Sequence, residues 1–208
     1  MTNSEKPLFH LLGTPVIVEP AAGFTAAVSA VLTALLAGER GLSNRLAMGA
    51  FGALCYPITD IIHYAGHIVS SRQVQAPMDA VRISAPMPSS VYLNNDVPPA
   101  AHMGRAIGGP IASTTAMLAA LALRPLTAAG SVARRLVTVF ALFQAIFGLG
   151  ALAPMPIIDG GTLLKWSLVA RGRTEAEADS IVQQAFSAFL AVAGVIGGLW
   201  AIRKISAK

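Results

Sequence analysis

Five long apolar segments dominate the sequence and set the solvent in which it can fold. They cover about residues 20–37, 46–71, 100–123, 131–152 and 175–204. Only 12% of the 208 residues are charged, whereas soluble proteins usually carry about 25%. About 20 apolar residues are needed for a helix to cross a bilayer. We therefore predict an all-α membrane protein with about five to six transmembrane helices, in which residues 1–208 form a single integral membrane domain.

The segment between the second and third predicted spans has a different character. Five prolines between residues 72 and 99 exclude a long helix there. Short runs at about residues 81–84 and 91–93 have the composition of strands, so we expect a small interfacial β element. A short helix is expected at about residues 163–170, before the last span.

The charge balance indicates which partners the chain has. Its formal net charge is +5, but no basic run is interleaved with aromatic residues, so we predict no nucleic-acid partner. Basic residues that flank apolar spans instead contact the headgroups of a lipid bilayer. They are spread almost evenly over the two sides of the predicted topology, so the positive-inside rule gives no orientation.

Ionisable side chains inside membrane spans are costly, and this makes them candidates for function. His63 and His67 lie in the second span, four residues apart, so they share one helix face. Two imidazoles at this spacing are the usual start of a zinc site. Asp159 follows the fourth span and therefore falls on the same side of the membrane. We predict zinc at His63, His67 and Asp159; the alternative is two histidines hydrogen-bonded in a polar groove.

Four segments resemble, in chain order, the site-2 proteases, which are intramembrane zinc metallopeptidases. His63-Tyr-Ala-Gly-His67 resembles the zinc-binding motif H-E-x-G-H of that family. Residues 154–161 resemble its N-x-x-P-x-P-x-L-D-G-G signature. Residues 107–113 resemble its A-G-P-x-x-N segment, and residues 12–20 resemble the G-I-P-V-x-V-x-P stretch that leads into the first span.

This resemblance implies a location and a substrate as well as a metal. It implies zinc at the two histidines and Asp159, and cleavage of transmembrane protein substrates. It places the protein in a prokaryotic cell membrane with its site near the cytoplasmic face. It implies that an unfolded substrate segment pairs with the β element. A substrate groove is implied at Gly109, Pro110, Ala151 and Pro154.

The sequence departs from the family pattern at three positions. Tyr64 replaces the catalytic glutamate, Ala151 replaces the asparagine of the second signature, and Ser113 replaces the asparagine of the third motif. In the family, the glutamate takes a proton from the attacking water. A phenol has an ordinary pKa of about 10 and is a poor base at neutral pH. Loss of such acid–base help typically costs about 10²- to 10⁴-fold in rate.

Asp60 is the carboxylate nearest in sequence to the histidines, three residues before His63 on the same face. Three roles remain open for it: accepting a hydrogen bond from a ligating imidazole, acting as a surrogate base, or making a structural contact.

We predict a catalytically impaired site-2-protease homologue, a pseudoprotease that acts as a membrane binding protein or as a subunit of a membrane complex. The alternative is an active, divergent intramembrane zinc metalloprotease that cleaves transmembrane substrates. A transporter or channel is a third class, but the sequence has no paired broken-helix repeats to support it.

Overall fold

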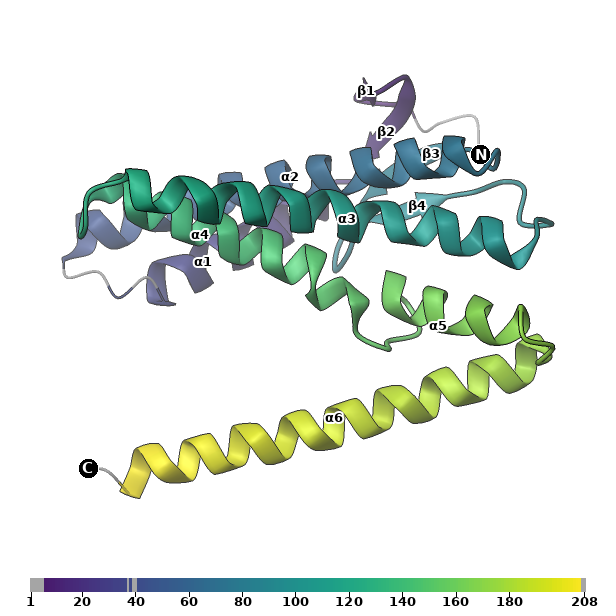
Figure 1. The fold of residues 1–208 in the computed structure, drawn as a ribbon. Helices are drawn as coiled ribbons and strands as arrows, with labels where there is room; N and C mark the ends of the chain where they lie inside the picture. Colours follow the sequence, from purple (N-terminus) through teal and green to yellow (C-terminus); the bar gives the residue numbers. More distant parts are fainter. Residues whose placement is uncertain (1–5, 37, 39–40, 207–208) are drawn as a thin grey trace.

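The computed structural model describes residues 6–36, 38 and 41–206. The chain is mostly helical, with a small sheet at one end of the helices (Figure 1). The helices are α1 (Ala22–Leu36), α2 (Leu42–Gln73), α3 (Pro99–Leu123), α4 (Val132–Gly148), α5 (Asp159–Val169) and α6 (Glu175–Ser206). Two short 3-10 turns, η1 (Arg124–Leu126) and η2 (Gly150–Leu152), extend α3 and α4. The predicted fold class is confirmed.

Four helices of the described chain are long and apolar enough to cross a membrane by length and composition: α2, α3 with η1, α4 with η2, and α6. The fifth apolar helix, α1, has only 15 residues. The helices match the five predicted spans to within a few residues at each end; residue 37, the last of the first predicted span, lies outside the described part. The predicted short helix is α5 and begins earlier than expected, at Asp159.

Small residues let α2 approach its two neighbours closely. A Cβ added at Gly52 would lie 2.6 Å from the Cβ of Thr33 on α1. A Cβ added at Gly66 would lie 2.6 Å from the Cβ of Ala112 and would collide with the carbonyl oxygen of Gly108, both on α3. Backbones can pack this closely only where side chains are absent, as is common between membrane helices.

The sheet has four strands in the order β1 (Phe9–Leu11), β2 (Thr14–Val18), β3 (Ala80–Ile83) and β4 (Ser89–Val91). The central pair, β2 and β3, is parallel, with Val16 opposite Val81, and both outer pairs are antiparallel. The β element expected from residues 81–93 corresponds to β3 and β4. The strands β1 and β2, which precede α1 in the sequence, were not predicted. β2 pairs with β3, and β1 pairs with β2.

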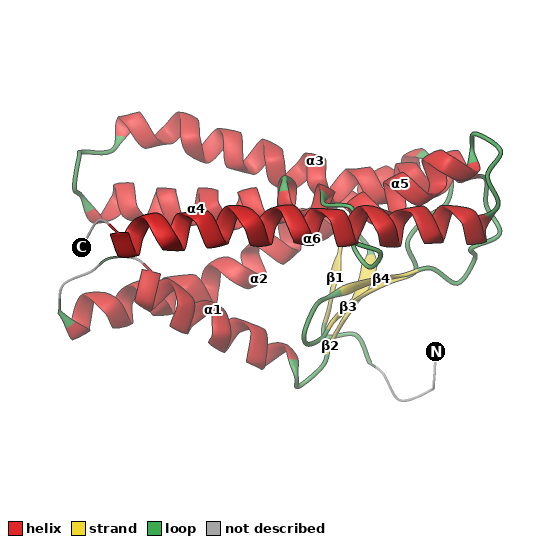
Figure 2. Cartoon of the chain, turned by 90° about the horizontal axis from the view of Figure 1, so that it is seen from below, coloured by secondary structure: helices red, strands yellow, loops and turns green. Residues whose placement is uncertain are grey.

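The sheet packs on the carboxyl-terminal end of α2 (Figure 2). Val16 and Val81, from the two central strands, are buried against Ile68 and Tyr64 of α2. This apolar cluster fixes the sheet relative to the helix that carries both candidate histidines.

The last helix, α6, diverges from the other helices (Figure 1). Its first turns pack on α5, where Ala178 and Val182 are buried. From Phe189 to Trp200 its large apolar side chains are exposed, as expected for a helix that faces lipid.

Candidate metal centre

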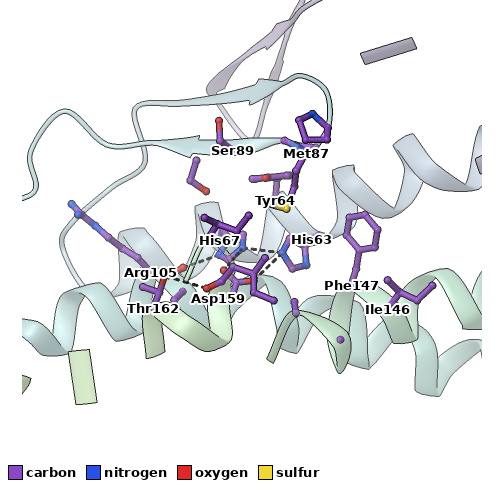
Figure 3. A pocket seen from close by; sticks show the side chains of 18 of the residues that line it. His63, Tyr64, His67, Met87, Ser89, Arg105, Ile146, Phe147, Asp159 and Thr162 are labelled. Carbon is purple, nitrogen blue, oxygen red and sulfur yellow. Dashed lines mark hydrogen bonds and ion pairs between the residues drawn. The ribbon is translucent and has the colours of Figure 1, made fainter. Parts of the chain in front are cut away.

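Two elements bring the three predicted ligands together. His63 and His67 lie on neighbouring turns near the end of α2, and Asp159 is the first residue of α5. Their ligand atoms lie close together: the two Nε2 atoms are 3.0 Å apart, and the carboxylate oxygens of Asp159 are 3.2 Å from His63 Nε2 and 3.4 Å from His67 Nε2 (Figure 3). The three side chains thus converge on one point.

This spacing is compatible with a zinc ion. Zinc binds imidazole nitrogen and carboxylate oxygen at about 2.0–2.2 Å in tetrahedral geometry, which separates neighbouring ligand atoms by about 3.3–3.4 Å. The observed separations are 3.0, 3.2 and 3.4 Å. Three protein ligands leave one tetrahedral position open, the arrangement typical of catalytic rather than structural zinc sites.

The other nitrogens of both imidazoles have partners of their own. His67 Nδ1 lies 2.8 Å from the backbone carbonyl oxygen of Arg105. A carbonyl oxygen only accepts, so this Nδ1 carries the proton and Nε2 presents a lone pair to the centre. His63 Nδ1 lies 3.1 Å from Ser113 Oγ. Hydrogen bonds of this kind orient histidines that bind metals and set their tautomers.

Gly109 lets α3 lie directly against the two ligand nitrogens. A Cβ added there would lie 2.5 Å from His63 Nε2 and closer still to His67 Nε2. Any larger residue would therefore fill the space that the metal and its ligands need.

The turn before α5 positions Asp159. Gly160 and Gly161 pack against the backbone of residues 152–156, and a Cβ at Gly161 would lie 2.6 Å from the carbonyl carbon of Met155. This explains why two glycines follow the aspartate. Burial alone would raise the pKa of Asp159, but the two imidazoles outweigh it and hold the pKa below its usual range. The group is therefore ionised at neutral pH, as a metal ligand must be.

A stacked pair of rings holds α5 in place. His102 of α3 lies parallel to Trp166, with 3.7 Å between ring centres and 2° between planes. On the other side of α5, Lys165 forms ion pairs with Glu175 and Asp179 of α6. The helix that carries the third ligand is thus fixed to both of its neighbours.

A cavity of about 750 Å³ opens beside the ligands. His63, His67 and Asp159 line it, together with Met87 and Ser89 from the sheet side and Ile146 and Phe147 from α4 (Figure 3). Tyr64 also lines this cavity, and its ring centre lies 5.7 Å from the ring centres of both His63 and His67. Its hydroxyl makes no hydrogen bond with any residue in the described part of the chain.

Asp60 lies deeper in the protein. It is fully buried beside Tyr56, one turn earlier on α2, and neither of its oxygens meets the geometry of a hydrogen bond within the described residues. Ser113 Oγ and the Arg105 carbonyl are the partners of the two imidazole Nδ1 atoms, and in this structure neither Nδ1 atom bonds to Asp60. The role of Asp60 remains a prediction. Asp60 is not among the described residues that line the cavity.

The four residues predicted to form a substrate groove lie in different places. Ala151 lines the cavity, and Gly109 lies against the ligand nitrogens. Pro110 is fully buried in α3, and Pro154 lies in the turn before α5. The groove role of these residues remains a prediction.

Sequence reasoning did not identify two contributors to the site. Ser113 was noted only as a substitution, although its position in a family motif was the available signal. Arg105 belongs to the basic residues that were counted on the two sides of the predicted topology, and that count indicates no role in the site. It is 4% exposed, its guanidinium donates to Ala76 O and Asn94 O, and it lies 4.2 Å from the centre of the Tyr92 ring. It therefore anchors both loops around β3 and β4.

Comparison with known proteins supports the fold. No protein-family model and no curated protein matches the sequence. Among solved structures, a site-2 protease from Methanocaldococcus jannaschii matches with a TM-score of 0.64 and 14% sequence identity, covering 97% of this chain and 88% of that chain.

The chain has a site-2-protease-like fold. The likeness to that protease extends over nearly the whole chain, including the sheet and the helices that carry the three ligands. This fold and the four long apolar helices of the described chain indicate an integral membrane protein.

Proposed function

We propose that this site-2-protease-like protein is a pseudoprotease: it holds one zinc ion at His63, His67 and Asp159 and binds an extended polypeptide segment without hydrolysing it at an ordinary rate. It acts as a membrane binding protein, for a transmembrane protein or for other subunits of a membrane complex. When bound, zinc supplies a Lewis acid that attracts oxygen ligands.

The observation that carries this proposal is Tyr64 at the wall of the cavity, equally distant from both ligating imidazoles. A phenol is protonated at neutral pH, so it donates a hydrogen bond where a glutamate would accept a proton. Peptide hydrolysis needs a general base at position 64, and the tyrosine there is instead a hydrogen-bond donor.

The surroundings of the cavity supply no clear replacement. Among the described residues that line it, Asp159 is the sole carboxylate, and it is a ligand. Asp60 is enclosed behind the cavity wall, with no exposed surface through which to reach a substrate. A general base must lie within hydrogen-bonding reach of the water that it activates.

The edge of the sheet supports the polypeptide part of the proposal. β4 pairs with β3 on one side and is the last strand of the sheet, and Ser89 and Ser90 line the cavity. An extended segment can add to such an edge through main-chain hydrogen bonds.

The test uses the full chain in detergent, loaded with zinc, and a fluorescent peptide that contains an apolar segment. We expect saturable binding and no cleavage, with one zinc ion per chain by elemental analysis. Cleavage that is lost in both His63→Ala and Asp159→Asn would contradict the proposal and establish the alternative, an active divergent protease.

We also propose that the centre lies near the cytoplasmic face of a prokaryotic cell membrane, which rests on the resemblance of the motifs. Ser90→Cys places a thiol beside the cavity, whereas the native Cys55 is buried. A membrane-impermeant maleimide should label this thiol in inside-out vesicles and leave it unlabelled in intact cells; the reverse pattern would invert the orientation.

A further inference from the structure

The Tyr64 hydroxyl is an unused donor beside a metal centre. It faces a cavity in which the two ligating imidazoles are already held by Ser113 and by the Arg105 carbonyl. Since no described residue accepts its hydrogen bond, a ligand in the cavity is the partner available to it.

The charge of the cavity favours an anionic ligand. Arg105 and Asp159 are the only formally charged residues that line it in the described part of the chain, and their charges cancel. A divalent cation at the three ligands therefore leaves a net positive charge. Such a charge attracts an anion, and the attraction is stronger in a protein cavity than in bulk water.

The identity of residue 64 decides which anion the site can accept. A glutamate at this position would place a negative charge next to the open coordination position and repel a second carboxylate. The tyrosine removes that charge and supplies a hydrogen bond in its place. Hydrogen bonds to charged acceptors are shorter and stronger than neutral ones.

The sheet edge indicates where such a carboxylate comes from. β4 is only three residues long, so an added strand can pair with it over only a short stretch. Ser89 and Ser90 of that strand line the same cavity as the metal ligands, so a paired segment runs to the metal centre within the cavity. A polypeptide that ends there presents its terminal carboxylate to the centre.

We propose that the cavity binds the carboxyl terminus of a polypeptide, with the Tyr64 hydroxyl donating a hydrogen bond to the terminal carboxylate beside the metal held by His63, His67 and Asp159. This inference rests on the proposed function and names the ligand of the same site. It describes capture of a chain end and includes no covalent step.

The experiment compares two fluorescent peptides of one sequence, one ending in a free carboxylate and the other in a carboxamide, by anisotropy with the zinc-loaded full chain in detergent. We expect the carboxylate peptide to bind about tenfold more tightly, the size of one charge-assisted hydrogen bond. The preference should fall in Tyr64→Phe, which keeps the metal but loses the donor, and in protein stripped of metal, which keeps the donor but loses the positive charge. The control is Thr115→Ala, whose hydroxyl bonds to Ile111 O of its own helix and is not among the described groups that line the cavity; this variant should keep the preference.

A second readout follows the metal directly. In cobalt-substituted protein, the carboxylate peptide should change the visible absorption spectrum, whereas the carboxamide peptide should leave it unchanged. Equal binding of the two peptides by the wild-type protein would overturn this inference and leave the proposed function standing. Failure of both peptides to bind would overturn the two together.

A fatty acid also carries a carboxylate, so a long-chain fatty acid is the third ligand in the binding experiment. If a long-chain fatty acid displaces the carboxylate peptide and binds more tightly than it does, the assignment to a polypeptide terminus is wrong. Weaker binding of the fatty acid supports the part played by the sheet edge.

Discussion

Ser113 Oγ on α3 lies 3.1 Å from Nδ1 of His63 on α2, and both groups are buried. The contact joins two helices and orients one imidazole of the metal centre. Loss of such an outer partner typically lowers metal affinity about 10- to 100-fold. We expect Ser113→Ala to weaken zinc binding by that amount, measured by competition with a chelator of known affinity. Thr115→Ala is the control, since its exposed hydroxyl bonds only to Ile111 O of its own helix.

We predict that the zinc content of the protein depends on His63, His67 and Asp159. We expect about one zinc ion per wild-type chain and a stoichiometry near zero in His63→Ala, His67→Ala and Asp159→Asn, because two remaining ligands hold the ion weakly. Elemental analysis after size-exclusion chromatography measures this. A wild-type protein purified in zinc-containing buffer that carries no metal would contradict the assignment.

Gly109 tests the space at the centre. Gly109→Ala should reduce zinc binding more than Ser113→Ala does, because its Cβ would collide with the Nε2 atoms of His63 and His67. Thermal unfolding in detergent should change in the same variant, since α2 and α3 must move apart. The matched substitution Gly194→Ala, on α6 with nothing within 4 Å, should leave both measurements unchanged.

Tyr64→Glu should restore a general base where the pocket is otherwise preserved. The expected gain is about 10²- to 10⁴-fold in peptide cleavage, the usual contribution of acid–base catalysis. Cleavage of a transmembrane peptide, followed by mass spectrometry, detects it, and Tyr64→Gln is the control that lacks an ionisable group. A silent Tyr64→Glu protein that still binds zinc would show that Ala151 or the cavity has also diverged.

The helices could be predicted from the sequence because every helix that crosses a bilayer needs a run of about 20 apolar residues, and such runs are visible in the sequence. The sequence also placed Asp159 on the same side as His63, since the chain crosses twice between them. β2 could not be found in this way. It pairs in parallel with β3, and both α1 and α2 lie between the two strands in the sequence. No local sequence pattern indicates a pairing partner at that separation.

The contacts of the imidazoles show a second limit of sequence reasoning. His67 is held by a backbone carbonyl, a group that every residue possesses, so Arg105 gives no signal of this role in the sequence. Gly109 lies in the segment that resembles the A-G-P-x-x-N motif, which implied a place in a substrate groove and gave no sign of its packing against the two imidazoles. A role that passes through a backbone carbonyl leaves no mark on the residue type, and so the contact of His67 with the Arg105 carbonyl could not be predicted.

The packing of the sheet on α2 has a consequence for affinity. The strand edge and two of the three metal ligands belong to one stiff unit, because α2 leads through a short loop into β3 and Tyr64 packs under Val16 and Val81. A chain that has paired with β4 is therefore delivered to the metal at a high effective concentration, and two individually weak contacts act as a chelate. A smaller residue at Val81 should loosen the packing of the sheet on α2. Binding at the metal centre should then weaken, while pairing of the added strand with β4 should remain.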